Sequence, residues 1–231
     1  YIDEGRMQGQ SKEQGRLGMK SVLRLAIFDC DGVLVDSWDA TMYLYNTVCM
    51  DMGRKSMHPD EEAFVFVSTL PQGFARLLGE ARVQEAMERV AAIPVDSIVE
   101  RIVPFPGVHQ ALQGLRDRGV ALAVCTNGGG EQHHALAGHG LDHLFDRVVT
   151  MEDVAFPKPH PQGLELILGE LSMPLEEAVF VGDSDSDRKT AQAANMSFWA
   201  FGNPSLQADL HVPDFGWLMQ HQETLVAGGK A

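Results

Sequence analysis

Two aspartates that directly follow an apolar run are the first residues whose types and spacing could do chemistry. The largely apolar run at 22–28 predicts a buried strand, and Asp29, Cys30, Asp31 and Gly32 come after it. Because side chains alternate along a strand, Asp29 and Asp31 should leave its end on the same side. Neighbouring carboxylates repel each other unless a cation or a proton separates them. The pair is therefore a candidate for metal binding or acid–base chemistry, and a simple acidic turn is the alternative.

Further polar residues follow predicted strands in the second half of the chain. They are Thr126 with Asn127 after 120–125, Lys158 after 147–150, and Asp183 with Asp187 after 178–181. The Thr126 hydroxyl and free backbone N–H groups of the Gly-rich loop at 128–130, just before a predicted helix, would make an anion site. Helical patterns separate these strands, and such alternation predicts an open parallel sheet with helices on both faces. Open α/β sheets bind ligands at the carboxyl ends of their strands. We therefore expect all of these side chains to meet at one edge of the sheet.

Composition limits the partners that the protein can have. The net charge of −14 over 231 residues argues against non-specific binding to nucleic acid or to an anionic membrane surface. No apolar run reaches the length of a membrane-spanning helix. The three cysteines are scattered and show neither a disulfide framework nor a metal-binding spacing. The scattered cysteines indicate a reducing compartment, so we expect a cytoplasmic protein. We also expect a small-molecule partner and a monomer or a small homo-oligomer.

The region between the aspartate pair and the second strand differs from the rest of the chain. Its apolar residues follow helical spacing, and a Pro- and Gly-containing segment at 104–107 ends the pattern. We therefore expect an all-helical domain at 38–103, inserted into a core domain made of 19–37 and 104–231. Residues 1–18 are polar and rich in Gly and Gln, so we expect a flexible or non-native extension there, with Met19 as a candidate natural start.

The segment from Asp29 to Ser37 resembles the first motif of the haloacid dehalogenase superfamily, Asp-x-Asp-Gly-Val/Thr-Leu-x-Asp-Ser, position by position. The later motifs of that family are matched in order by Thr126, Lys158, and Asp183 with Asp187. The resemblance covers the chain from about residue 22 onward. It implies an α/β core with a Rossmann-like open parallel sheet. It also identifies the helical insertion with the cap domain of one subclass, whose substrate choice we expect to depend on residues within 68–74.

The resemblance also implies catalytic roles. Asp29 would be the nucleophile that attacks phosphorus and forms an aspartyl phosphate. Asp31 would protonate the leaving oxygen and then deprotonate the hydrolytic water. Thr126, Asn127 and Lys158 would bind the phosphoryl oxygens. The helical cap would close over the site and exclude bulk water.

Charge predicts a metal at the same place. Four aspartates, Asp29, Asp31, Asp183 and Asp187, would meet a single lysine, Lys158, so the cluster needs a cation. Hard oxygen ligands suit Mg²⁺. By the family pattern, the carboxylates of Asp29 and Asp183 and the backbone carbonyl of Asp31 would hold the ion, with Asp187 as a further ligand or a partner of one.

The layout looks most similar to the phosphoglycolate-phosphatase type, so we expect a Mg²⁺-dependent phosphatase of a small phosphorylated metabolite. Dehalogenases and phosphonatases lack the second aspartate, and Asp31 argues against both. A sugar phosphomutase of the β-phosphoglucomutase type is an alternative, which Thr41 weakens because well-known hexose phosphomutases have a histidine at that place. A non-catalytic phosphate-binding protein is a further alternative, although it would not need the aspartate pair. Pro157 and Gln162 depart from the family pattern without removing a catalytic group.

Overall fold

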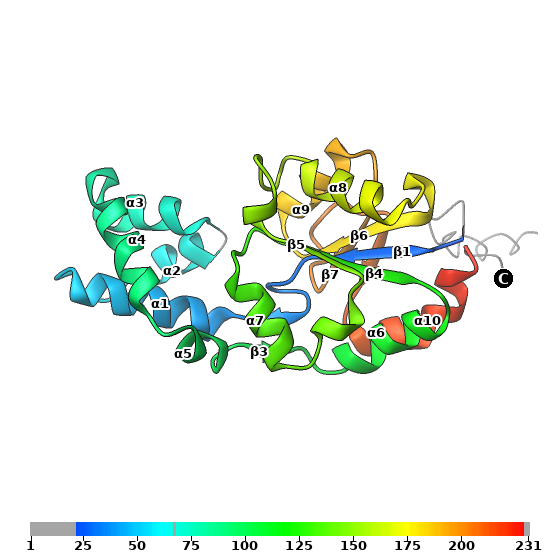
Figure 1. Ribbon diagram of the computed structural model, residues 1–231, viewed down its shortest axis with the longest axis horizontal. Coiled ribbons are helices and arrows are strands. Elements are labelled where there is room, and N and C mark those ends of the chain that lie inside the picture. Colours follow the sequence, from blue (N-terminus) through cyan, green and yellow to red (C-terminus); the bar gives the residue numbers. More distant parts are fainter. Residues whose placement is uncertain (1–21, 67, 229–231) are drawn as a thin grey trace, which may run out of the picture.

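A parallel sheet lies at the centre of the larger part of the molecule (Figure 1). The computed structural model describes residues 22–66 and 68–228, so the extension expected at 1–18 lies outside the described residues. The six strands are ordered β5-β4-β1-β6-β7-β8, and all adjacent pairs are parallel. Their bounds are β1 Leu25–Phe28, β4 Ala121–Cys125, β5 Arg147–Val149, β6 Ala178–Gly182, β7 Ser197–Phe201 and β8 Leu210–Val212.

The central strand β1 sets the position of the first aspartate pair. Phe28 pairs with Val124 of β4 on one side and with Val181 of β6 on the other. The loops that follow these three strands therefore leave the sheet at the same level. This register brings the residues after β1, β4 and β6 together at the carboxyl edge.

Helices cover both faces of the sheet, as the alternation of strands and helices predicts. In Figure 1, α6 (Val108–Asp117) and α10 (Phe215–Val226) lie below the sheet, on the face that α7 (Glu131–Gly138) also packs against. On the opposite face lie α8 (Gln162–Leu171) and α9 (Asp185–Ala193). Alternate residues of β1 serve the two faces, since Ala26 and Phe28 belong to one buried cluster and Leu25 and Ile27 to the other.

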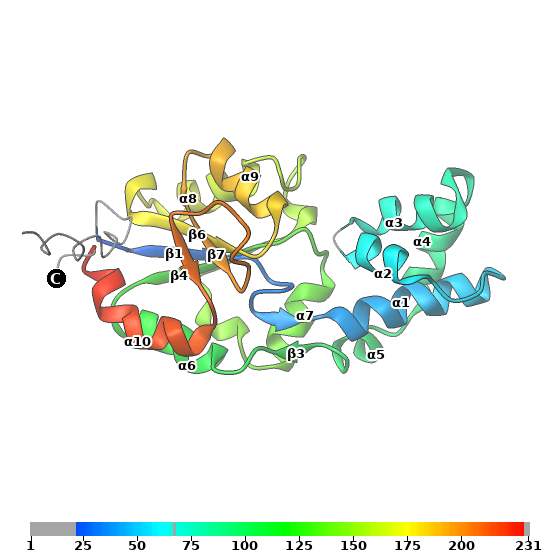
Figure 2. The same ribbon diagram turned by 180° about the vertical axis from the view of Figure 1, so that it is seen from behind.

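The insertion forms a separate group of helices with its own buried cluster (Figures 1 and 2). The helices are α1 Trp38–Asp51, α2 Pro59–Phe66, α3 Leu70–Leu78, α4 Val83–Ala92 and α5 Val95–Val99. At the centre of the cluster, the rings of Tyr45 and Phe74 lie 4.7 Å apart between centroids. The helical pattern expected for this region is therefore present, and the group lies beyond the carboxyl end of β1 (Figure 1).

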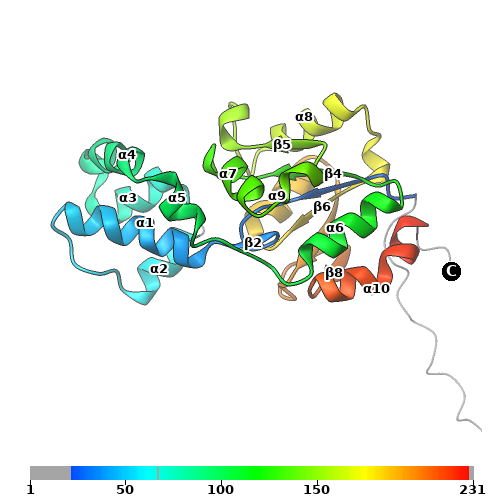
Figure 3. The same cartoon turned by 60° about the horizontal axis from the view of Figure 1, so that its bottom comes forward.

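The two connections between the insertion and the sheet run side by side (Figure 3). They pair as a short antiparallel ribbon of β2 (Val35–Asp36) and β3 (Val103–Pro104), in which Asp36 lies opposite Val103. The sequence reading expected only helices through Val103 and missed this ribbon and β8. Strands of two or three residues are too short to show a periodic pattern.

Short 3₁₀ turns complete the secondary structure, at Glu80–Arg82, Asp142–Leu144, Met151–Asp153 and Leu175–Glu177. Within the described residues, none of the helices has both the length and the apolar character needed to cross a membrane.

Candidate active site

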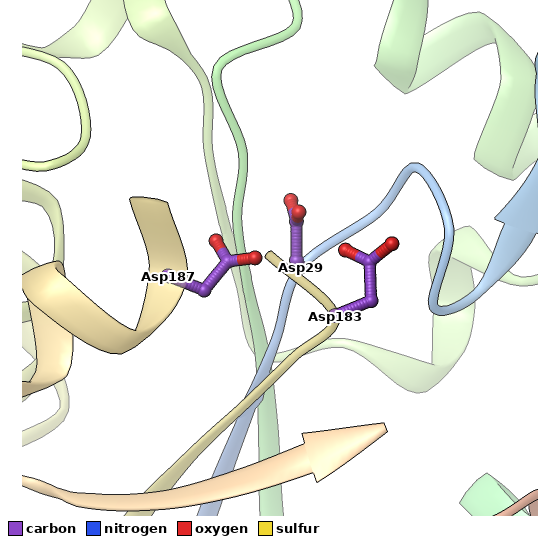
Figure 4. A group of neighbouring side chains, drawn as sticks. All are labelled: Asp29, Asp183 and Asp187. Atoms are coloured by element: carbon purple, nitrogen blue, oxygen red, sulfur yellow. The ribbon is translucent and has the colours of Figure 1, made fainter. Parts of the chain in front are cut away.

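Three carboxylates gather at the carboxyl edge of the sheet (Figure 4). Asp29 follows β1, Asp183 follows β6, and Asp187 lies in the first turn of α9. One carboxylate oxygen from each lies within 4.8 Å of the others. The structure therefore brings together side chains that are far apart in the sequence, as the strand-end pattern predicts.

The ammonium of Lys158 lies between two of these carboxylates. Its Nζ is 2.8 Å from Asp29 Oδ1 and 2.6 Å from Asp187 Oδ1, and all three side chains are buried. Burial disfavours the charged ammonium, but the carboxylates of Asp187 and Asp29 outweigh it and raise the pKa of Lys158. The lysine therefore stays positively charged at neutral pH, next to the carboxylate expected to react with phosphate.

Burial also raises the pKa of Asp29 well above the usual range for an aspartate, and the neighbouring Asp187 carboxylate acts in the same direction. Lys158 opposes both effects without cancelling them. A buried carboxylate in this position needs more positive charge than one lysine supplies. The excess of carboxylates over ammonium groups, from which the sequence predicts a metal, is thus present among Asp29, Asp183, Asp187 and Lys158.

The carboxylate of Asp187 is already satisfied by protein groups. Its Oδ1 accepts from Lys158, and its Oδ2 accepts from the Ser184 N–H at 3.1 Å and from the Ser184 hydroxyl. Ser184 is the N-cap of α9 and in turn accepts from the Asp187 N–H at 3.2 Å. Of the two roles left open for Asp187, the geometry favours a partner that holds Lys158 over a direct metal ligand.

The carboxylates of Asp29 and Asp183 fit a divalent cation, to which the family pattern adds the backbone carbonyl of Asp31 as a predicted ligand. Gly32 adopts a positive φ of 78°, and a Cβ built there would lie 2.2 Å from Asp183 Oδ2. Only glycine therefore lets the loop after β1 approach Asp183. Burial and the Asp187 charge raise the pKa of Asp183 to about 6. An all-oxygen donor set with excess negative charge fits Mg²⁺.

Thr126 and Asn127 lie on the opposite side of Asp29, after β4. Thr126 is buried, and its Oγ1 accepts from the Gly128 N–H at 3.0 Å, which leaves its hydroxyl proton available for an oxygen anion. The amide of Asn127 binds the main chain of Lys158 through two hydrogen bonds of 2.9 Å each. The Asn127 side chain thus supports the lysine loop, and its proposed phosphate contact would have to come from its backbone N–H.

The Gly-rich loop before α7 differs from the expectation of free backbone donors. The Gly129 N–H donates to Glu131 Oε1 at 2.8 Å, and the Gly130 N–H donates to Glu152 Oε1 at 3.1 Å. Carboxylates are favoured at a helix N-terminus because the first N–H groups of the helix carry partial positive charge. The expectation that both of these N–H groups are free for an anion is therefore wrong.

A cavity of about 880 Å³ opens on the far side of Asp183, next to Gly32. Its other walls are mainly apolar and include Phe105, Phe201 and Met219. The charged residues in its lining, Asp183 and Asp214, are both acidic and would repel a phosphate. The phosphate is therefore better placed on the side of Asp29 that carries the buried lysine.

A model of haloacid dehalogenase-like hydrolases matches residues 26–201, from β1 to the end of β7. This span contains every motif residue described above. The chain belongs to the haloacid dehalogenase-like hydrolase family.

Several members of the haloacid dehalogenase-like hydrolase family resemble the chain. A phosphoglycolate phosphatase of Pectobacterium atrosepticum is 38% identical over 115 residues, about half the length of each protein (49% of both). One from Haemophilus influenzae is 28% identical over 192 residues, 78% of this chain and 85% of that protein. A crystal structure of a subfamily IA hydrolase of the superfamily, from Geobacter sulfurreducens, has a TM-score of 0.77 and 30% identity, covering 86% of this chain and 98% of that one.

These similarities confirm the superfamily, the α/β fold class and the enzyme class, a phosphatase, that the sequence predicts. The residue roles carried over from the haloacid dehalogenase pattern stay predictions. The two departures from that pattern are accommodated locally, since Gln162 Oε1 accepts from the Phe156 N–H at 2.9 Å and so closes the loop around Pro157 and Lys158.

Sequence reasoning missed one buried polar residue at the site, Gln132 in the first turn of α7. Its Nε2 donates to Asp31 Oδ2 at 2.8 Å, and its Oε1 accepts from the Cys30 thiol at 3.0 Å. Burial raises the pKa of Asp31, and hydrogen bonding from Ser37 opposes that rise. A glutamine in a first helical turn is not distinctive in sequence, and only the fold brings it to Asp31.

Proposed function

We propose that the protein is a Mg²⁺-dependent phosphatase that hydrolyses a small phosphomonoester through an aspartyl phosphate on Asp29. The observation that carries this proposal is the buried carboxylate of Asp29, 2.8 Å from the Lys158 ammonium and among two further aspartates. Such a carboxylate can approach a phosphate dianion only where positive charge offsets their repulsion. The phosphatase relatives support the same chemistry.

The first half of the reaction transfers the phosphoryl group to the protein. An Asp29 oxygen forms a bond to phosphorus while the bond from phosphorus to the leaving oxygen breaks, and Asp31 gives that oxygen its proton. Lys158 and the Thr126 hydroxyl stabilise the charge on the phosphoryl oxygens. Bound Mg²⁺, held by Asp29, Asp183 and the Asp31 carbonyl, would add positive charge at these oxygens.

The second half regenerates the enzyme. Asp31, now ionised, takes a proton from a water molecule as the water oxygen attacks phosphorus. The bond between phosphorus and Asp29 then breaks, which releases inorganic phosphate and restores both side chains to their starting states. Asp31 therefore acts first as acid and then as base.

Two further parts of the proposal concern the surroundings of the site. The helices at 38–103 would act as a cap that closes over the carboxyl edge, because the β2–β3 ribbon is their connection to the site.

The three cysteines, Cys30, Cys49 and Cys125, are all free thiols in buried positions. Free thiols support placement in a reducing compartment such as the cytoplasm.

The decisive experiment measures phosphate release from phosphoglycolate, nitrophenyl phosphate and a set of sugar phosphates. We expect release that requires Mg²⁺, is lost with EDTA and returns when Mg²⁺ is restored. Asp29→Asn should abolish it for every substrate. Turnover in metal-free buffer would rule out the proposed metal site, and an isomerised sugar phosphate without phosphate release would support the mutase alternative instead.

A further inference from the structure

Gln132 joins the loop after β1 to the helix after β4 through both ends of its side chain. The residue is 4% exposed. Its amide nitrogen donates to Asp31 Oδ2 at 2.8 Å, and its amide oxygen accepts from the thiol of Cys30 at 3.0 Å. Cys30 and Asp31, which are neighbours in the loop after β1, are thus both hydrogen-bonded to one glutamine that lies 101 positions away from Asp31.

The contacts determine which way the amide faces. A thiol can donate its single proton to the amide oxygen, whereas a carboxylate oxygen can only accept from the amide nitrogen. A flipped Gln132 would place two acceptors together at Asp31, and it would also place its amide N–H groups against a thiol that is a weak acceptor. Cys30 therefore fixes the orientation in which the glutamine donates to Asp31.

Gly128 packs directly against the side chain of Gln132. A Cβ built at Gly128 would lie 2.4 Å from both the Cγ and the Nε2 of Gln132, so any other residue would displace the side chain. The Gly128 N–H is itself bound to Thr126 Oγ1 at 3.0 Å. The backbone that supports the predicted phosphate-binding threonine thus also confines Gln132.

We propose that Gln132 is a positioning residue for Asp31, with the Cys30 thiol setting the orientation of its amide. The inference rests on the proposed function, in which Asp31 exchanges a proton with the leaving oxygen. A carboxyl group rotates about its last side-chain bond. The Gln132 N–H holds Oδ2 and, together with the hydrogen bond from Ser37, restricts that rotation. Oδ1 then stays free of the amide for the proton transfer.

The alternative is a purely structural fastener between α7 and the loop after β1. Such a fastener would affect all substrates alike when it is removed. A positioning residue affects the step in which Asp31 acts, so its removal should slow substrates whose leaving oxygen needs a proton and spare those whose leaving group departs as a stable anion. The two roles can therefore be separated by the leaving group.

The test uses the full chain with Mg²⁺ and rapid mixing, and it follows formation of the aspartyl phosphate. Gln132→Met keeps the length and burial of the side chain but removes the donor. We expect it to slow the reaction of phosphoglycolate by roughly 10–10²-fold, because small displacements of a catalytic group cost that much, and to leave the nitrophenol burst rate nearly unchanged. An equal loss for both substrates would overturn the proposal.

Three further variants secure the result. Gln222→Met is a matched control, since Gln222 is equally buried but donates to the Ala111 carbonyl, in the contact between α10 and α6. It should keep the wild-type ratio of the phosphoglycolate rate to the nitrophenol burst rate. Cys30→Ser retains a donor to the amide oxygen and should also keep the ratio, whereas Cys30→Ala should lower it. If Gln132→Met fails to fold, equal ratios in the two Cys30 variants overturn the proposal.

Asp31→Asn separates failure of this inference from failure of the proposed function. If Asp31→Asn slows phosphoglycolate selectively and Gln132→Met does not, the positioning role is wrong and the acid role stands. If Asp31→Asn slows the two substrates equally, the acid role itself is wrong.

Discussion

The side-chain amide of Asn127 and the main chain of Lys158 exchange two hydrogen bonds, each 2.9 Å long. One residue after β4 thereby holds the loop that carries the buried ammonium. The position of Lys158 Nζ between Asp29 and Asp187 therefore depends on contacts at both ends of the lysine. The family pattern suggests Asn127 as a phosphate contact, but its side chain positions the Lys158 ammonium.

Replacing Asn127 should affect turnover more than substrate affinity. Asn127→Leu removes both hydrogen bonds, so we expect kcat to fall by roughly 10–10²-fold because Lys158 is displaced. Loss of the partners should also lower the free energy of unfolding by about 1–3 kcal/mol. Asn127→Asp keeps the acceptor for the Lys158 N–H, so its kcat and its free energy of unfolding should lie between those of the wild type and those of Asn127→Leu. Steady-state kinetics and denaturant unfolding measure both effects, and a raised KM with unchanged kcat would instead assign the side chain to substrate binding.

The two aspartates of the first motif should fail in different ways. Asp31→Asn should slow alkyl phosphates by roughly 10²–10⁴-fold, because their leaving oxygen needs a proton. With nitrophenyl phosphate it should give a burst of nitrophenol and then stall, since hydrolysis of the aspartyl phosphate also needs Asp31 as a base. Asp29→Asn should give no burst. Rapid-mix kinetics distinguish the two variants, and a retained burst in Asp29→Asn would disprove its role as nucleophile.

Mg²⁺ binding should depend on pH through Asp183. In the metal-free protein, burial raises the pKa of this carboxyl to about 6 from the ordinary 3.8. Protonated Asp183 therefore contributes stability to the metal-free fold that is complete below about pH 3.8 and lost as the pH rises through about 6. Mg²⁺ binds the ionised form, so it must compete with this proton at low pH.

The measurement is the rise in Tm caused by Mg²⁺ at about pH 7.5 and at about pH 5, on either side of the raised pKa. We expect a clear rise at the higher pH, since a ligand at about 100 times its Kd adds about 2.7 kcal/mol of stability. The rise should be much smaller at the lower pH. Asp183→Asn should abolish it, and Asp185→Asn, which alters a carboxylate bound to Arg188 and Lys189, should not. An equal rise at both pH values would contradict the assignment.

Changes within 68–74 of the proposed cap should alter substrate preference without altering the metal site. Gln72 is exposed, and its side-chain oxygen accepts a hydrogen bond from the Thr69 N–H at 3.3 Å. This contact is part of the cap at the N-terminus of α3. Gln72→Ala should therefore change relative kcat/KM values among phosphorylated substrates while the Mg²⁺ concentration for half-maximal activity stays the same. A weakened response to Mg²⁺ in this variant would show that the segment supports the metal site.

The parts of the fold that the sequence predicts are those dominated by local pattern. Strands β1, β4 and β6 contain only apolar residues and glycine because both faces of these strands are covered, and the polar residues that follow them mark the site. Pairing partners carry no such pattern. The ribbon of Asp36 with Val103 and the contact of Gln132 with Asp31 join residues separated by more than sixty positions, so they are fixed only when the whole chain packs.

The same reason explains the error at the Gly-rich loop. Gly129 and Gly130 have the composition of an anion-binding turn, and the sequence shows that composition. It does not show that the carboxylates of Glu131 and Glu152 reach the N–H groups first. One comes from the adjacent helix and the other from the turn after β5, so competition within the protein decides the outcome.

The β2–β3 ribbon also bears on how this architecture can vary. Asp36 and Val103 face each other across the ribbon, so the polypeptide leaves the sheet domain and re-enters it at one point. Exchange of the intervening helices for a shorter hairpin, or for a different module, would leave the ends of the remaining chain in register. The core strands and their carboxylates could thus be kept intact while the accessory module is replaced wholesale.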